Sequence, residues 1–309
     1  MSTKDRRIRN LKKQLRWYPF LIISLAALVL FVYIPMFNTA RYSLYDISIV
    51  GAGNETFIGL KNYRTLLGQS RFLRALCNTF ALTLMGLVTI PLGFFLAVLI
   101  NSLGRGRTQA FFRIGFYLPN IITGISVILM VQAVLQGEGG LLNTFLSFLF
   151  RRKISIGWIS DIRYSKIGAT ILWCWMNTGY SMLMNLASLQ AIPSELYEAS
   201  EIDGASAWDK VRYITAPIMK YCFTFLLVTG VINGLSRFTD LFVLGSNSSA
   251  GLPGGTLQSI LMYIYQFSFE VPSHGISSAG SMILFALVFF FTMINVKLTG
   301  FLEDEEEVG

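Results

Sequence analysis

Six long hydrophobic stretches, separated by more polar connections, dominate the chain. They cover residues 18–36, 79–100, 112–135, 167–189, 218–243 and 279–299. A helix needs about 20 apolar residues to cross the hydrocarbon core of a bilayer, and each stretch is close to that length. The first is too long for the hydrophobic region of a signal peptide, so we interpret it as an uncleaved helix. The pattern predicts an all-α polytopic membrane protein with six transmembrane helices.

Short charged segments flank the predicted transmembrane domain of residues 18–300. Residues 1–17 form a basic N-terminal arm, which suits an anionic inner leaflet and acts either as a topology anchor or as a partner-binding helix. Residues 301–309 form an acidic tail, which we expect to be solvated and to which we assign no function.

The amino-acid composition also indicates a protein that is surrounded by lipid. The 309 residues are 53% hydrophobic and 14% charged, with a mean hydropathy of +0.57 and a net charge of +8. Fourteen Lys and Arg residues lie in the arm, in loops 101–113 and 190–220, and at Lys297, against ten in the opposite loops. Basic residues favour the cytoplasmic side, so both termini are predicted to be cytoplasmic. The basic run 151–153 goes against this rule.

The chain lacks the residues of an enzyme or a metal centre. Its three cysteines, Cys77, Cys174 and Cys222, are scattered among apolar residues, and His274 is the single histidine. No phosphate-binding G-x-x-x-x-G-K-[ST] loop occurs. We therefore predict no catalytic residue, no metal and no bound cofactor, and any ATP that drives this protein would bind to another subunit.

The connection 191–217 is too regular for a simple loop. Ser194 can cap a short helix that has Glu195 in its first turn, and Asp203 with Gly204 supplies a turn. Ser206 and Asp209 form an S-x-x-D pattern that starts a second short helix, and Pro217 ends or bends it. The segment predicts two helices joined by a tight turn.

Four large side chains on this hairpin cannot all face lipid or water: Leu196, Tyr197, Ile202 and Trp208. With the neighbouring acids they would form an apolar knob that fits a groove in a partner protein. The alternative is a hairpin that lies against the helices of its own chain. The residues alone leave both interpretations open.

The same segment resembles the EAA loop of ABC importer permeases. Glu198, Ala199 and Ser200 are followed by Asp203 and Gly204, and later by Ile214, Thr215, Ala216 and Pro217, with the spacing of the E-A-A…G…I-x-L-P pattern. Ser200 replaces the second alanine and Ala216 replaces leucine. Segments such as Phe57–Tyr63, Tyr117–Pro119 and Thr256–Tyr265 are similar to the carbohydrate-uptake branch, the maltose and glycerol-phosphate permeases of MalF and UgpA type.

This resemblance implies a type I (MetI-like) permease fold in a bacterial or archaeal inner membrane, with a cytoplasmic EAA coupling helix. It implies four kinds of partner: a second homologous permease, two ATPase subunits that hold ATP and Mg, an extracytoplasmic solute-binding protein, and a sugar or oligosaccharide. Glu198 to Gly204 would dock on the ATPase, and solute would cross by alternating access. The chain would form half of the pore.

Polar and aromatic residues share faces on two predicted spans. In the fourth, Trp173, Asn177 and Tyr180 recur at helical spacing, with Trp175 beside them. In the fifth, the corresponding residues are Asn233, Gly234, Arg237 and Asp240. Rings that stack on sugar C–H faces, beside amide and charged groups, suit a sugar pathway. Ordinary helix packing is the alternative, with Arg237 paired to Asp240.

The resemblance favours the pathway, because solute contacts in the maltose permeases lie on the spans before and after the EAA loop. Arg237 would then meet an acidic sugar, a phosphate ester or Asp240. In some importers with two permeases, only one permease contacts the solute, so this chain could be the permease that makes no solute contact. Two other classes remain as alternatives: an ion-coupled secondary transporter, and a membrane scaffold or sensor that uses the hairpin without transport.

Overall fold

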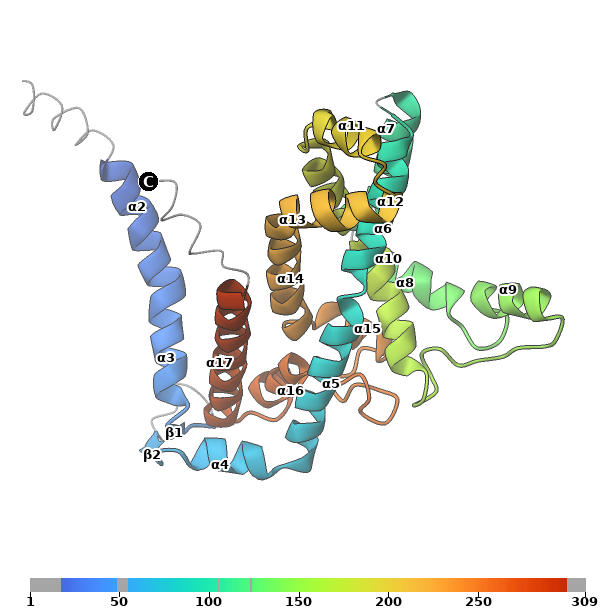
Figure 1. Cartoon of the computed structure of the whole chain (residues 1–309). Coiled ribbons are helices and arrows are strands. Elements are labelled where there is room, and N and C mark those ends of the chain that lie inside the picture. Colours follow the sequence, from blue (N-terminus) through green and yellow to red (C-terminus); the bar gives the residue numbers. More distant parts are fainter. Residues whose placement is uncertain (1–17, 49–54, 105, 123, 299–309) are drawn as a thin grey trace, which may run out of the picture.

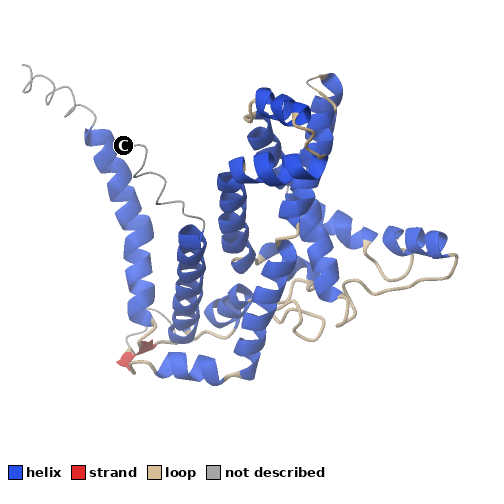
Figure 2. Ribbon diagram, viewed as in Figure 1, coloured by secondary structure: helices blue, strands red, loops and turns tan. Residues whose placement is uncertain are grey.

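The computed structural model describes residues 18–48, 55–104, 106–122 and 124–298. About three quarters of this part is helical, and one pair of two-residue strands is drawn in red in Figure 2. The strands are β1 (Tyr45–Asp46) and β2 (Thr56–Phe57), which pair antiparallel with Tyr45 opposite Phe57. The predicted arm 1–17 and tail 301–309 lie outside the described residues.

In the first half of the chain, the described residues form one long composite helix and six further helices. They are α2 (Tyr18–Leu28), η1 (Val29–Tyr33), α3 (Ile34–Tyr42), α4 (Lys61–Gly68), α5 (Ser70–Gly86), α6 (Thr89–Ser102), α7 (Arg107–Ile121), α8 (Gly124–Val134) and α9 (Leu141–Phe150). Helix α9 lies away from the body of the molecule, at the right of Figure 1.

The described part of the second half contains the long helices α10 and α17, with α14 and a series of shorter helices between them. They are α10 (Ser165–Gln190), α11 (Ser194–Ile202), α12 (Ala207–Lys210), η2 (Val211–Thr215), α13 (Ala216–Ile218), α14 (Lys220–Leu235), α15 (Thr239–Leu244), α16 (Ile260–Tyr265), η3 (Gln266–Glu270) and α17 (His274–Leu298). In Figure 1, α11 and α12 lie at one end of the long helices, and α4 lies at the other.

Three helices among the described residues are long and apolar enough to cross a membrane: Leu21–Tyr42, Ser70–Ser102 and His274–Lys297. Two bent pairs raise the number to five. They are Arg107–Ile121 with Gly124–Val134, bent by 100°, and Ala207–Ile218 with Lys220–Leu235, bent by 68°. The fourth predicted stretch, 167–189, is helical throughout as part of α10. The count of six spans stays a prediction.

Two predicted spans differ from the structure. The stretch 112–135 is divided between α7 and α8, and Pro119, which has no N–H to donate, lies inside the last turns of α7. The stretch 218–243 is one helix only to Leu235. Its later part folds as α15, where Leu241 and Leu244 are buried. Their hydrophobicity serves the protein core, so hydropathy alone could not separate them from the span.

Helix α10 is the centre of the packing. Small residues allow α6 and α7 to approach it closely: a Cβ on Gly93 would lie 2.4 Å from Ser181 Oγ, and one on Gly179 would lie 2.0 Å from the backbone oxygen of Phe116. Close contact through small residues is the usual means by which helices associate in lipid. The same helix therefore fixes the positions of both neighbours.

Polar contacts hold the connection between α15 and α16 against the helix bundle. Asn78 of α5 donates to the backbone oxygens of Gly255 and Gln258 at 2.8 and 3.1 Å. Ser165 at the start of α10 contacts Thr256 Oγ1 at 2.7 Å. Because buried backbone oxygens need partners, these side chains keep the irregular segment in place.

Candidate functional site: a projecting hairpin and a buried polar centre

The hairpin is built by caps and a tight turn. Gly204 has φ +76°, a left-handed conformation that suits glycine, and it joins α11 to the segment before α12. Ser206 and Asp209 form the predicted capping box: the Ser206 hydroxyl accepts from the Asp209 N–H at 3.2 Å, and Asp209 Oδ2 accepts from the Ser206 N–H at 3.0 Å. The predicted cap at Ser194 is wrong, because Pro193 holds the cap position and Ser194 begins the helix.

Hydrogen bonds also set the charge state of the hairpin. The Ser206 side chain and backbone donate to Asp209 and lower the pKa of its carboxyl group. Lys210 Nζ lies 2.7 Å from Glu201 Oε1 and lowers the pKa of Glu201 by a hydrogen bond and by its charge. Both acids are therefore held as carboxylates, and the second contact ties α12 to the end of α11.

The four apolar side chains of the predicted knob divide into two pairs. Tyr197 is half-buried and its hydroxyl lies 2.9 Å from Thr215 Oγ1, while Leu196 is 43% exposed. In contrast, Ile202 is 88% exposed and Trp208 is 70% exposed. Tyr197 thus fastens the hairpin to its own chain, and the two most exposed side chains remain uncovered.

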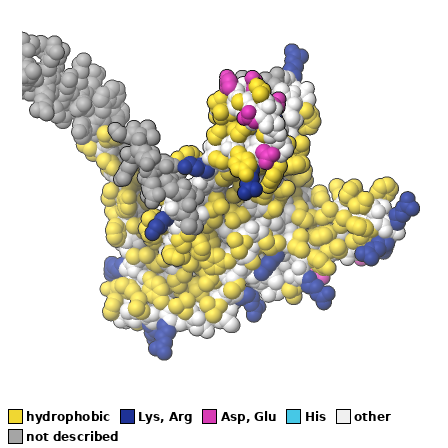
Figure 3. Space-filling model, in the orientation of Figure 1, with side chains coloured by type: hydrophobic (Ala, Val, Ile, Leu, Met, Phe, Trp, Pro, Cys, Tyr) yellow, Lys and Arg dark blue, Asp and Glu magenta, His cyan; other side chains and the backbone are white. Residues whose placement is uncertain are grey.

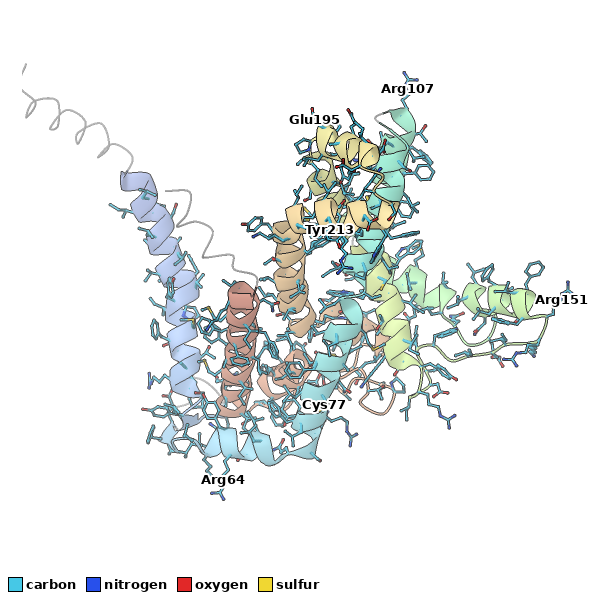
Figure 4. The ribbon with its side chains drawn as sticks, viewed as in Figure 1. Arg64, Cys77, Arg107, Arg151, Glu195 and Tyr213 are labelled. Atoms are coloured by element: carbon cyan, nitrogen blue, oxygen red, sulfur yellow. The ribbon has the colours of Figure 1, made fainter. Side chains whose placement is uncertain are left out.

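The residues of the EAA-like pattern are on the exposed side of α11 and its turn. Glu198, Ala199, Asp203 and Gly204 are exposed, whereas Ser200 is half-buried and donates to the Tyr197 backbone oxygen at 2.7 Å. Acidic side chains gather over this end of the molecule in Figure 3, above a largely hydrophobic surface. Figure 4 shows Glu195 and Arg107 at this end, with Arg64 at the opposite one.

The predicted pathway residues do not form one site. Four of them, Trp173, Asn177, Tyr180 and Asn233, line a common cavity of about 40 Å³ between α10 and α14, which we call the central cavity. A water molecule occupies about 30 Å³ in the liquid, so this space is too small for a sugar ring. The structure therefore shows these side chains in a closed arrangement.

The remaining pathway residues have other surroundings. Trp175 is 53% exposed and lines a separate apolar groove of about 690 Å³ beside α6 and α7. Gly234 faces α5, where a Cβ would lie 2.6 Å from Thr83 Cγ2, so its role here is packing. Neither Trp175 nor Gly234 lines the central cavity in this arrangement, and their place in a solute pathway stays a prediction.

Arg237 and Asp240 lie within the predicted fifth span, but the structure places them after the end of α14, where they form a buried pair. Arg237 Nε and Nη2 donate to Asp240 Oδ2 at 2.9 and 2.5 Å, and Nη2 also donates to the Ala169 backbone oxygen at 3.1 Å. The guanidinium carbon lies 4.4 Å from the ring centroid of Trp173, a cation–π contact. Arg237 is thus an internal ion-pair partner in this structure.

Sequence reasoning missed two kinds of contributor. Thr89 and Thr229 line the central cavity. The Thr229 hydroxyl donates to the Phe225 backbone oxygen of its own helix, and the Thr89 hydroxyl donates to the Gly86 backbone oxygen at the end of α5. Ser259 donates to the Arg237 backbone oxygen at 2.8 Å and caps α16. A serine directly before the apolar run 260–265 is a recognisable cap signal.

Comparison with known proteins identifies the family. The model of the binding-protein-dependent transport system inner membrane component matches residues 89–300. The chain belongs to this family. Among similar members are the multiple sugar-binding transport system permease MsmF of Streptococcus mutans, 27% identical over 94% of this chain and 98% of the relative, and the trehalose/maltose transport system permease MalF of Thermococcus litoralis, 31% identical over 93% and 94%.

A solved structure supports the fold of this family member. The chain is similar to a bacterial ABC transporter involved in the import of the acidic polysaccharide alginate, with a TM-score of 0.80 and 22% identity over 95% of this chain and 98% of that one. The fold is thus that of an ABC importer permease. With its apolar helices, the protein is a multi-pass membrane protein and a transport subunit.

Proposed function

We propose that this family member is the permease subunit of an ATP-driven importer of a sugar or oligosaccharide, and that it forms half of the translocation pore. The projecting hairpin carries this proposal. Ile202 and Trp208 are the exposed apolar contacts, next to the carboxylates of Glu198 and Asp203, and Tyr197 fixes their position. Such a knob suits a groove with basic residues at its rim, which a separate ATPase with bound ATP and Mg would supply.

The proposed cargo rests on relatives of this chain. Several of these relatives have the name of a sugar in their own names. MalF of Thermococcus litoralis is a trehalose/maltose permease, and AraP of Halalkalibacterium halodurans, which is 31% identical over 91% of this chain, is an arabinooligosaccharides permease. We propose the same class of neutral saccharide here. The described residues that line the central cavity are uncharged, and the nearby Arg237 is paired with Asp240, so this site favours a neutral saccharide over an acidic one.

Transport requires the central cavity to open. Trp173, Tyr180, Asn177 and Asn233 supply rings and amides around a space that is closed in this structure. Separation of α10 from α14 would enlarge it, and alternating access driven from the hairpin would expose it to each side in turn. In this proposal a second homologous permease completes the pore, and two ATPase subunits dock on the two hairpins.

An extracytoplasmic solute-binding protein would deliver the sugar. One solved relative is a bacterial alginate ABC transporter in complex with an alginate pentasaccharide-bound periplasmic protein. In the proposed orientation, both termini and the hairpin are cytoplasmic, and the loops at the α4 end receive the binding protein. An ion-coupled transporter is not favoured, because the chain belongs to a binding-protein-dependent family.

The test is to place a charge on the exposed knob. Ile202→Asp should abolish co-purification of the ATPase and lower sugar uptake more than tenfold, because a buried unpaired carboxylate costs several kcal/mol, and 1.4 kcal/mol is a factor of ten. Ile202 is 88% exposed, so the permease itself should keep its melting temperature.

The matched control is Val271→Asp, at a residue that is 53% exposed and follows η3, away from the hairpin. This variant should retain the ATPase. Normal uptake and normal ATPase recovery with Ile202→Asp would contradict the docking role, and loss of uptake in both variants would show that the effect is not specific to the hairpin.

A further inference from the structure

A second polar cavity lies at the end of the molecule away from the hairpin. It has a volume of about 520 Å³ and is bounded by the end of α8, by Ile159 and Ser160 before α10, and by residues between 244 and 254 at and after the end of α15. We call it the loop cavity. It is more than ten times larger than the central cavity and falls within the 300–1,000 Å³ typical of small-molecule sites.

Hydrogen bonds hold the walls of the loop cavity in place. Asn143 of α9 donates to the backbone oxygens of Gly137 and Ile156 at 2.8 and 2.9 Å, and Ser155 donates to Gly137 at 2.9 Å. On the other side, Thr256 donates to the Pro253 backbone oxygen at 2.7 Å. These contacts are local and fix each wall separately, and the contact of Ser165 with Thr256 joins the two walls, so the space is shaped before any ligand arrives.

The polar side chains that line this cavity have no hydrogen-bond partner among the described residues. They are Gln132, Gln136, Ser160 and Ser246. The neighbouring Asn143 differs, because its amide contacts several backbone oxygens and the Trp158 indole. Two amides and two hydroxyls therefore remain available as donors and acceptors.

The lining selects for a class of ligand. Among the described residues, none that lines the loop cavity carries a charge, which disfavours an ionised amino acid or a phosphate ester, since either needs a charged partner when it leaves water. Leu135, Leu252 and Pro253 offer apolar surface beside the amides. Hydroxyl groups next to C–H faces are the chemistry of a neutral saccharide.

We propose that the loop cavity is a transit site for a neutral saccharide on its way to the central cavity. This inference rests on the proposed function of the chain. The described residues that line the cavity include no aromatic ring, so they offer no stacking surface that would hold a sugar strongly, as suits a position from which solute must move on.

Helix α15 connects the two cavities through a short series of contacts. Leu244 lines the loop cavity, and Asp240, one turn earlier on α15, is the ion-pair partner of Arg237. Arg237 stacks on Trp173, and Trp173 lines the central cavity. The transit site is therefore adjacent to the element that supports the wall of the predicted pathway.

Protection of introduced cysteines tests this site in the complete importer. Ser160→Cys and Ser246→Cys are each made in a chain whose three native cysteines are replaced, and the complex, without ATP, is treated with a charged maleimide. Trehalose, maltose, lactose and arabinotriose are the probes. A sugar at about ten times its Kd should slow alkylation of both positions about tenfold, because only the unoccupied fraction reacts.

The control position is Arg163→Cys, which is exposed in the same connection but does not line the cavity. Its alkylation should not change with sugar, and Gln132→Leu with Gln136→Leu should remove the protection at Ser160→Cys. Equal alkylation with and without sugar at both test positions, or equal slowing at the control, would overturn the transit site.

Uptake of the same four sugars by the unaltered complex is measured separately. Uptake of a sugar that gives no protection overturns the loop cavity proposal and leaves the proposed function intact. Absence of ATP-dependent uptake of all four sugars counts against the proposed function itself. Protection by a transported sugar supports both.

Discussion

Arg237 shows how a residue's role depends on neighbours that its spacing does not reveal. Its side chain is 1% exposed, and three hydrogen bonds and the Trp173 ring surround it. Nη1 is buried without a partner among the described residues. The i, i+3 spacing made Asp240 a reasonable candidate for the ion-pair partner of Arg237. Ala169 and Trp173 belong to α10, and their contacts with Arg237 could not be identified from the sequence.

Removal of one partner should be more harmful than removal of both. Asp240→Asn leaves the Arg237 guanidinium buried without its counter-ion, and breaking a buried pair in this way costs about 3–5 kcal/mol. Arg237→Met with Asp240→Leu fills the space with apolar atoms and should be closer to the unaltered protein. Thermal unfolding of the purified chain measures the difference. A double variant less stable than Asp240→Asn would contradict this expectation.

The hairpin is the element that the sequence predicted best. Its turn, its capping box and its two helices depend on contacts within a few residues, and local patterns report such contacts. The ends of α7 and α14 were not predicted, because hydrophobic residues continue past both breaks. The division of the pathway residues between a cavity, an ion pair and a packing contact depends on the rotation of α10 and α14, which periodicity alone does not determine.

Acid should loosen the hairpin. The pKa of Asp209 is lowered in the folded state, so its contribution to stability is present above the unfolded value of about 3.9 and is lost as the pH falls through the lower folded value. Pepsin cleavage near Trp208, normalised to an unfolded reference peptide, should rise over that interval. In Ser206→Ala the pKa of Asp209 is lowered less, so cleavage should already be higher at neutral pH and should rise less on acidification. An unchanged profile would show that the Asp209 bonds do not hold the hairpin.

The contact between α7 and α10 should tolerate no side chain at Gly179. In Gly179→Ala the new Cβ would lie 2.0 Å from the Phe116 backbone oxygen, so the helices must separate, at a cost of about 1–3 kcal/mol or more. Gly115→Ala in α7 is the matched control, because a Cβ there meets nothing within 4 Å. Melting temperatures of the two purified variants are compared. Equal values would mean that the helices can adjust without loss.

At the scale of the whole molecule, the structure separates two ends with different surfaces. The hairpin and Arg107 lie at one end, and Arg64 lies at the other (Figure 4). Hydropathy predicts that a bilayer lies between them, and the count of basic residues predicts which end is cytoplasmic. Neither signal says how the helices pack, because lipid-facing and protein-facing side chains are equally apolar.

The proposed orientation can be measured with single cysteines. In a chain without native cysteines, Arg64→Cys should react with an impermeant maleimide in intact spheroplasts. Glu195→Cys should react only after the membrane is opened, because the hairpin is proposed to be cytoplasmic. The reverse pattern would invert the topology, and reaction of both positions in intact cells would contradict a membrane between the two ends.

The ion pair described above also bears on how the chain is made. Asp240 follows Arg237 by three residues, and α10, which supplies Ala169 and Trp173, is synthesised earlier. A lone charge at the centre of an inserting helix costs about 2.5–3.5 kcal/mol on translocon scales. Here Asp240, which neutralises Arg237, leaves the ribosome only three residues after it. The segment can therefore enter the bilayer as a neutral ion pair, because the Ala169 backbone oxygen and the Trp173 ring that contact Arg237 have already been synthesised. Insertion of the pair does not depend on α17.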